Sequence, residues 1–334
     1  MTRDHPLGPL VAELAADLRE VVLPHLGRDE GRAHFGDGAG GDVTFAIDER
    51  AEARMEAFLA ERAPDVAFYS EDRGLVVPGG EPRWVLVVDP IDGTRPALAG
   101  LESACVSVAA APFGGEPRMA DVEVGCVVEI KSGQRFLAIR GGGVDPAPRL
   151  SAETSAERML WTYGFRGRPV VPTAIVLAEL LDGSSVAGGT FDLGSATYDM
   201  TRLVTGQLDA YVEPGPRMID EVDWVRAEFE RVGRGAILNN SPYDLAAGAL
   251  ILDEAGAIVT DASGRSLGDR PLLGSGHDFQ MSCVCAANAE LHAAIVASLD
   301  AGIERRRAAG PGCSSAACPP RVDSLRTCPP SRSR

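Results

Sequence analysis

The sequence predicts a layered protein with an α+β first half and an α/β second half. Two helical patterns open the chain and a run of short apolar segments follows them. Beyond residue 150, strand and helix patterns alternate. Three consecutive glycines at 141–143, with Pro146 and Pro148, mark the boundary between the two patterns. We therefore expect an N-terminal half over residues 1–145, a C-terminal half over 146–302, and a disordered tail over 303–334, where proline, serine and arginine dominate.

The first half begins with an amphipathic helix over residues 7–26, because its leucines and valines recur at helical spacing. A glycine-rich loop at 36–42 follows, and then a second helix over 47–62, which ends before Pro64. The apolar segments after it are expected to be strands at 66–70, 84–88, 105–110, 122–130 and 135–140.

The second half alternates strands and helices, as expected of sheets covered by helices. Strands are predicted at 159–163, 208–212, 258–261 and 282–286. Helices are predicted at 173–181, 195–205, 242–255 and 289–299.

Composition restricts the possible functions. The 334 residues are 45% apolar and carry a formal net charge of −16, which opposes binding to nucleic acid. No apolar run approaches the ~18 residues of a membrane span, and the N-terminus lacks a signal-peptide pattern. We therefore expect a cytoplasmic protein with neither a membrane nor a nucleic acid as partner. A phosphorylated ligand would need a bound cation to offset the negative charge.

The segment WVLVVDPIDGT (84–94) carries the strongest chemical signal. An apolar strand leads directly into Asp89 and Asp92, and carboxylates brought together at a strand end are the ligands that hard cations require. The alternative is that Asp-Pro and Asp-Gly merely form a turn.

Three further acids are ambiguous from the sequence. Glu71, in YSED at the end of a predicted strand, fits either a metal ligand or a solvated loop acid. Asp244, in SPYD, either completes a capping box at the start of a helix or faces a metal. Asp48, in GDVTFAID, either stabilises the start of the second helix or holds a water together with a threonine.

These segments together carry a family resemblance. GDVTFAID, SED, VVDPIDGT, GSATYDM, GQLDAYVE and YDLAAGALILDEAGA occur in the order and approximate spacing of the inositol monophosphatase family. The chain resembles this family over residues 7–300. The resemblance implies a layered αβαβα sandwich of the inositol monophosphatase and fructose-1,6-bisphosphatase type.

The resemblance also implies roles for individual residues. Two or three Mg²⁺ ions would be held by Glu71, Asp89, the carbonyl of Ile91, Asp92 and Asp244. Thr94 and Asp48 would activate the attacking water, so that Asp48, Thr94, Glu71 and Asp92 form the catalytic set. The backbone N–H groups of Gly93 and Thr94 would bind the phosphate. Contacts to the alcohol part of the substrate would come from Gly194, Ser195, Ala196 and Glu213.

The activity that follows from the resemblance is Mg²⁺-dependent hydrolysis of inositol monophosphate or a similar small sugar or polyol phosphate. Alternatives are the same chemistry on fructose-1,6-bisphosphate, a 3′-phosphoadenosine nucleotide or NADP, or histidinol phosphate, and a non-catalytic metal-binding regulatory relative. The resemblance further implies a homodimer and sensitivity to Li⁺.

Two segments depart from a simple match. Residues 214–240 read as an insertion, in which Val222, Val225 and Phe229 recur at helical spacing. A surface helix packed on the sheet is the first interpretation, and a substrate lid is the second. Residues 36–41 fit a dinucleotide-binding GxGxxG pattern, but no strand precedes them, which argues against that function.

Overall fold

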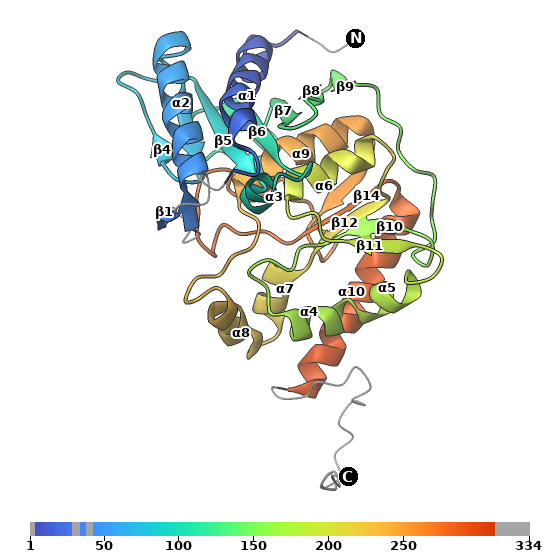
Figure 1. The fold of residues 1–334 in the computed structure, drawn as a ribbon. Coiled ribbons are helices and arrows are strands. Elements are labelled where there is room, and N and C mark those ends of the chain that lie inside the picture. Colours follow the sequence, from blue (N-terminus) through green and yellow to red (C-terminus); the bar gives the residue numbers. More distant parts are fainter. Residues whose placement is uncertain (1–3, 29–33, 38–42, 311–334) are drawn as a thin grey trace, which may run out of the picture.

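The computed structural model describes residues 4–28, 34–37 and 43–310, and its elements form five layers (Figure 1). The layers run helices, sheet, helices, sheet, helices, which is the αβαβα sandwich that the resemblance implies. Residues 38–42 of the glycine-rich segment and 311–334 of the predicted tail lie outside the described residues. Within the described part of the chain, no helix is long and apolar enough to cross a membrane.

A mixed seven-stranded sheet forms the upper part of the molecule in Figure 1. Its strand order is β4-β3-β5-β6-β7-β8-β9. The strands are β3 (Ala67–Ser70), β4 (Gly74–Val76), β5 (Trp84–Asp92), β6 (Cys105–Pro112), β7 (Val124–Glu129), β8 (Arg135–Ile139) and β9 (Gly143–Asp145). Helices α1 (Gly8–Val22) and α2 (Ala46–Arg62) cover one face of this sheet and bury their apolar residues against it.

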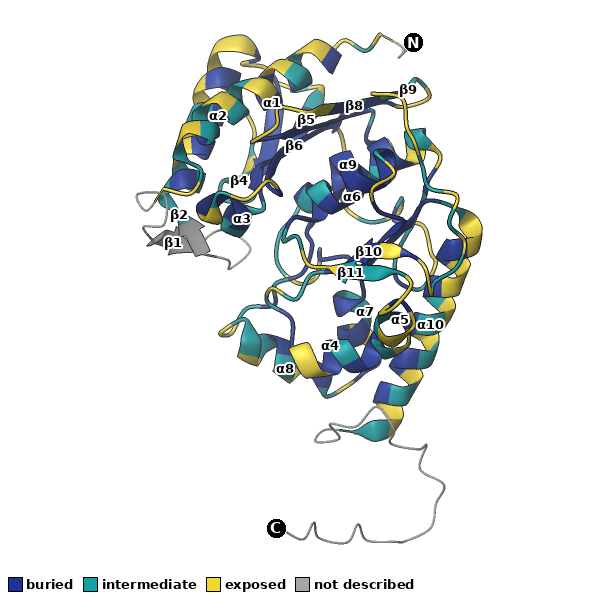
Figure 2. Ribbon diagram, turned by 45° about the vertical axis from the view of Figure 1, so that its right-hand side comes forward, coloured by how far each residue is buried: buried dark blue, intermediate teal, exposed yellow. Residues whose placement is uncertain are grey.

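The central layer consists of α6 (Ala196–Val204) and α9 (Pro242–Ala255), which pack against each other between the two sheets. Both helices are almost completely buried, as Figure 2 shows by their dark colouring. Helix α9 is therefore apolar on all sides, which is expected of a helix enclosed by sheets rather than by solvent.

The second sheet has five strands in the order β11-β10-β12-β14-β13. These are β10 (Leu160–Thr162), β11 (Gly189–Phe191), β12 (Ala210–Glu213), β13 (Ile258–Thr260) and β14 (Cys283–Ala286). The outer helical layer contains α4 (Val170–Val176), α5 (Ala178–Gly183), α7 (Gly215–Glu221), α8 (Val225–Val232) and α10 (Ala289–Ala309). Shorter elements are η1 (Leu23–His25), β1 (His34–Asp37), β2 (Val43–Phe45), α3 (Thr94–Ala99) and η3 (Met119–Asp121).

Helix α10 extends well beyond its predicted end at residue 299, so residues 303–309 are helical and the expected tail begins too early. Tertiary contacts hold these last turns. The Arg306 guanidinium lies 4.3 Å from the centre of the Trp224 ring, and Arg307 Nε donates to the carbonyl of Glu221 at 2.6 Å. Composition alone could not predict these contacts, because Glu221 lies 86 residues before Arg307 in the chain.

The segment 214–240 forms α7 and α8 rather than one surface helix. Val222, Val225 and Phe229 are at most 1% exposed and belong to the same apolar cluster as α10 and the second sheet. The segment is therefore part of the core of the lower half. The predicted helix at 173–181 is likewise two short helices, α4 and α5, separated at Leu177, where ψ is 0°.

Candidate metal centre

Strand β5 carries its two aspartates to one side of the sheet by means of an irregularity. Asp89 pairs with Ser107 and Asp92 with Cys105, so three residue steps on β5 span two on β6. In a regular strand, residues three apart face opposite sides, but one extra residue restores a common side. Pro90 sits inside this bulge and has no N–H to donate to the sheet. The bulge thus brings together two acids that a straight strand would separate.

Asp89, Asp92 and Asp244 form the candidate metal centre. One carboxylate oxygen from each lies within 4.8 Å of those from the other two. Burial raises the pKa of Asp89 well above its usual range, and the neighbouring charges of Glu71, Asp92 and Asp244 raise it further. Three acids held this close in a buried site repel one another unless a proton or a cation lies between them. The donor set, oxygens alone, matches a hard divalent cation.

Asp92 is fixed by the first turn of α6. Its Oδ2 accepts hydrogen bonds from Ser195 Oγ at 2.8 Å and from the backbone N–H of Thr197 at 2.6 Å. These hydrogen bonds lower the pKa of Asp92, but burial outweighs them and the net shift is upward. Ser195, predicted from the resemblance as a substrate contact, is therefore also a ligand-positioning residue.

Asp244 both caps a helix and lies in the acidic cluster. Its Oδ2 accepts the backbone N–H of Ser241 at 2.6 Å, which completes a capping box at the start of α9. The same carboxylate belongs to the acidic cluster. Burial raises the pKa of Asp244 to about 7, and the charge of Asp92 contributes to the shift. A carboxylate has two oxygens, so capping and clustering do not exclude each other.

Asp48 and Thr94 lie next to each other beside this cluster. Thr94 Oγ1 is 3.2 Å from Asp48 Oδ1 and 3.2 Å from the carbonyl oxygen of Ile91. The other carboxylate oxygen of Asp48 accepts the backbone N–H of Phe45 at 2.8 Å, at the start of α2. Burial raises the pKa of Asp48 to about 7, which is suitable for a group that exchanges a proton near neutral pH.

Glu71 lies outside the closest set of three acids but acts on it electrostatically. After burial, its charge is the largest cause that raises the pKa of Asp89. The segment that carries Glu71 is held by Glu52, a residue that the sequence analysis did not select. Glu52 is 1% exposed and accepts hydrogen bonds from Ser70 Oγ at 2.8 Å and from the Asp72 N–H at 3.3 Å. The signal was present in the sequence, because Glu52 follows Asp48 by four residues on one helix face.

Replacement of Glu52 by glutamine tests the contribution of this buried carboxyl group to stability. Burial raises the pKa of Glu52 to about 7, so the folded chain binds a proton at this site that the unfolded chain releases above pH ~4.5. Its contribution to the free energy of unfolding therefore falls as the pH rises from about 5 to about 7. We expect Glu52→Gln to flatten this decline by about 1–3 kcal/mol. Urea unfolding at pH 5.0 and 7.5 measures the difference, and an unchanged pH dependence would contradict it.

Two glycines close the site. Gly93 has φ +89°, and a Cβ there would lie 2.6 Å from the Ser103 carbonyl oxygen and 2.9 Å from Ser195 Cβ. Gly194 has φ +82°, and a Cβ there would lie 3.1 Å from Cγ of Pro96. No other residue fits at Gly93, because both the left-handed backbone and the close approach exclude a side chain.

Glu213, expected from the resemblance to contact the substrate alcohol, is buried and paired within the protein. It is 1% exposed, its Oε2 is paired with Arg168 and its Oε1 accepts the N–H of Gly215 at 2.8 Å. Arg168 also donates to Asn240 Oδ1 at 3.3 Å and to the Arg166 carbonyl at 2.6 Å. Both oxygens of Glu213 are thus engaged by the protein, and Glu213 positions Arg168.

A polar cavity adjoins the acids. Gly194, Ser195 and Ala196 line it together with Asp92 and Asp244, and its lining also contains Arg166, Arg168 and Asn239. Local patterns could not have selected these last three residues, since arginine and asparagine in loops are usually solvated. Only the fold brings them to the cavity beside the metal centre.

The fold and the cluster of buried acids define a class: a two-sheet αβαβα protein with a candidate divalent-metal centre at the end of a buried strand. The inositol monophosphatase family model matches residues 8–304. The chain belongs to the inositol monophosphatase family.

Individual relatives agree with this membership. The chain is 27% identical over 303 residues to the fructose-1,6-bisphosphatase/inositol-1-monophosphatase of Methanothermobacter thermautotrophicus, with coverage of 87% of this chain and 95% of that protein. It is 26% identical over 266 residues to the Nus factor SuhB of Xylella fastidiosa, with coverage of 78% and 83%. The IMPase of Thermotoga maritima has the same fold, with a TM-score of 0.65 at 20% identity over 89% of this chain and 98% of that one.

Proposed function

We propose that this protein is a Mg²⁺-dependent phosphomonoesterase that acts on inositol monophosphate or a similar small sugar or polyol phosphate. The observation that carries the proposal is the convergence of Asp89, Asp92 and Asp244 beside the Asp48–Thr94 pair. Family membership and a relative named for both fructose-1,6-bisphosphatase and inositol-1-monophosphatase support the same chemistry.

The residues present suit the metal. Asp89, Asp92 and Asp244 would hold two or three Mg²⁺ ions together with Glu71 and the carbonyl of Ile91. The pKa of Asp89 is raised by burial first and then by the charges of its neighbours, which a cation would offset. Bound Mg²⁺ would lower the pKa of a coordinated water and neutralise the phosphate and the developing alkoxide.

Residues of the chain would carry out the remaining steps: activation of the water and binding of the phosphate and the alcohol. Thr94 Oγ1 orients the attacking water. The proton that the water loses passes through Thr94 to Asp48, whose raised pKa allows it to accept a proton near pH 7. The N–H groups of Gly93 and Thr94 bind the phosphate oxygens. Water attacks phosphorus as the bond to the alcohol oxygen breaks, and the leaving oxygen takes a proton from solvent. Gly194, Ser195 and Ala196 line the space for the alcohol.

A panel of phosphomonoesters tests the activity and its substrate. We expect phosphate release to require Mg²⁺, to stop on chelation and to be inhibited by Li⁺. Inositol 1-phosphate, fructose 1,6-bisphosphate, adenosine 3′,5′-bisphosphate, NADP and histidinol phosphate are compared by kcat/KM with p-nitrophenyl phosphate as the generic ester. Equal values for all of these would remove the substrate assignment, and no release from any ester would favour a non-catalytic metal-binding regulator.

We also propose that the protein forms a homodimer and is located in the cytoplasm. Leu101, Leu160 and Phe191 are 51%, 40% and 43% exposed and line one open apolar pocket, which is a surface suited to a second copy of the chain. Sedimentation velocity tests the dimer, since a monomer at micromolar concentration would contradict it.

The four described cysteines, Cys105, Cys126, Cys283 and Cys285, are free and buried, as is usual in a reducing compartment.

A further inference from the structure

A second pocket lies beyond the polar cavity, and we name it the distal pocket. It has a volume of about 200 Å³ and is lined by Ile219 and Arg226 from the α7–α8 segment and by Asn239, Arg270, His277 and Gln280. The segment that supplies Ile219 and Arg226 is the one that reads as an insertion in the sequence.

Two guanidinium groups in the distal pocket have no acidic partner among the described residues. Arg226 makes one hydrogen bond within that part of the chain, between its Nη2 and His277 Nε2 at 3.0 Å. Arg270 donates there only to the backbone carbonyls of Asp278 and Gln280, at 3.4 and 3.0 Å. Asp220 and Asp278 also line the pocket, yet neither carboxylate forms an ion pair with these two arginines in the described ranges.

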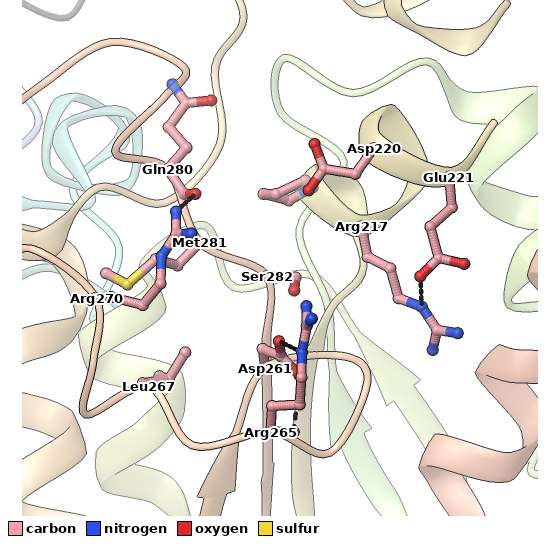
Figure 3. A pocket seen from close by; sticks show the side chains of 11 residues that line it. Arg217, Asp220, Glu221, Asp261, Arg265, Leu267, Arg270, Gln280, Met281 and Ser282 are labelled. Carbon is pink, nitrogen blue, oxygen red and sulfur yellow. Dashed lines mark hydrogen bonds and ion pairs between the residues drawn. The ribbon is translucent and has the colours of Figure 1, made fainter. Parts of the chain in front are cut away.

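The arginines of the neighbouring pocket are arranged differently. Figure 3 shows Arg217 beside Glu221 and Arg265 beside Asp261, with N–O distances of 2.9 Å in both pairs, whereas among the residues drawn Arg270 is joined only to the backbone carbonyl of Gln280. In a chain with a net charge of −16, acids to pair with arginine are abundant. Two arginines that line one cavity without such a partner favour an anionic ligand there.

Asn239 connects the distal pocket with the polar cavity of the metal centre. It lines both, and it is only 9% exposed. Neither its Oδ1 nor its Nδ2 has a hydrogen-bond partner within the described residues, and the same holds for Nε of Arg168 in the polar cavity. Both polar atoms are buried within the protein, so Asn239 forms part of the boundary that the two pockets share and shows that they adjoin.

We infer that the substrate carries a second anionic group, which binds Arg226 and Arg270 in the distal pocket. The inference rests on the proposed function, because it places the scissile phosphate at the metal centre. It narrows the substrate class to phosphomonoesters of an alcohol with another phosphate or carboxylate.

The test compares substrates that differ only in a second phosphate. Fructose 1,6-bisphosphate is paired with fructose 1-phosphate, and adenosine 3′,5′-bisphosphate with adenosine 3′-monophosphate. We expect the wild-type protein to prefer the bisphosphate of at least one pair by about tenfold or more in kcat/KM, chiefly through KM. The double variant Arg226→Gln/Arg270→Gln should lose this preference and hydrolyse the monophosphate as the wild type does.

The matched control is Arg231→Gln/Arg265→Gln, which removes two positive charges from the same region. Arg231 lies on α8 beside Glu228 and is 66% exposed, and Arg265 is 78% exposed. This variant should keep the preference for the bisphosphate. Thermal unfolding of each variant shows that the fold is retained.

The outcomes separate the inference from the proposed function. The absence of a preference in both bisphosphate pairs and for 3-phosphoglycerate over glycerol 3-phosphate, or a preference that survives in Arg226→Gln/Arg270→Gln, overturns the distal site and leaves the phosphatase intact. Whether the second group is a carboxylate is tested by comparing 3-phosphoglycerate with glycerol 3-phosphate as substrates of the wild type and the same variants. If only this pair shows a preference, and Arg226→Gln/Arg270→Gln loses it, the distal site binds a carboxylate. Failure to hydrolyse every ester, p-nitrophenyl phosphate included, overturns the proposed function and this inference with it.

Discussion

Asp92→Asn is expected to reduce Mg²⁺-dependent phosphate release by about 10³-fold or more while the fold is retained. Asparagine can place its carbonyl oxygen where Asp92 Oδ2 accepts hydrogen bonds from Ser195 and Thr197, so the first turn of α6 keeps its support. The other end of the side chain would present an amide NH₂ to the cluster, which replaces a ligand by a donor and removes one negative charge. A loss of this size corresponds to about 4 kcal/mol of transition-state stabilisation.

The comparison uses single-turnover phosphate release and circular dichroism of both proteins. Asp65→Asn is the matched control, since it makes the same chemical change at an exposed position outside the site. It should leave the rate unchanged. If Asp92→Asn kept more than about a tenth of the wild-type rate, the metal centre would not be the catalytic site.

The second large effect concerns stability. We expect Mg²⁺ to raise the Tm of the wild-type protein by several degrees, because a ligand that binds only the folded chain at about 100 times its Kd stabilises it by about 2.7 kcal/mol. Asp89→Asn should abolish most of this increase. In EDTA the same variant should be as stable as the wild type or more stable, because Asp89 is 2% exposed and lies among Glu71, Asp92 and Asp244.

Clustered buried charges are costly to the folded state, and both asparagine at this position and bound Mg²⁺ reduce that cost. The introduced asparagine could still accept the N–H of Ile91, which lies 2.9 Å from Asp89 Oδ1, so the bulge in β5 is expected to persist. Differential scanning calorimetry of both proteins, in EDTA and in millimolar Mg²⁺, measures the four Tm values. A marked destabilisation of Asp89→Asn in EDTA would show that Asp89 is a structural residue rather than a metal ligand.

Much of the fold could be predicted from local patterns. Helix α9 begins at Pro242 and ends at Ala255, as predicted, because a capping serine, a proline in the first turn and a terminal glycine mark both ends. The end of α10 could not be predicted in this way. Its last turns, rich in arginine, are held by contacts with Trp224 and Glu221, and such contacts leave no periodic trace in the sequence.

The residues of the candidate site also fall into those that local patterns indicate and those that only the fold brings together. Asp89, Asp92 and Asp244 could be selected from the sequence because each stands at the end of a strand or the start of a helix, where acids can converge. The cap at Asp244 and the metal centre were alternatives in the sequence and are compatible in the structure. The sequence did not indicate the ion pair of Glu213 with Arg168, which lies 45 residues earlier in the chain.

The longer strands and helices, the acids at their ends and the resemblance to the family could be determined from the sequence alone, because those properties depend on neighbouring residues. The partners of Glu213, the support of Glu71 by Glu52 and the meeting of Arg226, Asn239 and Arg270 at one cavity were decided only by the tertiary structure. These groups come from segments far apart in the chain. Which charges are neutralised and which stay available to a ligand depends on how the layers pack, and no local pattern encodes it.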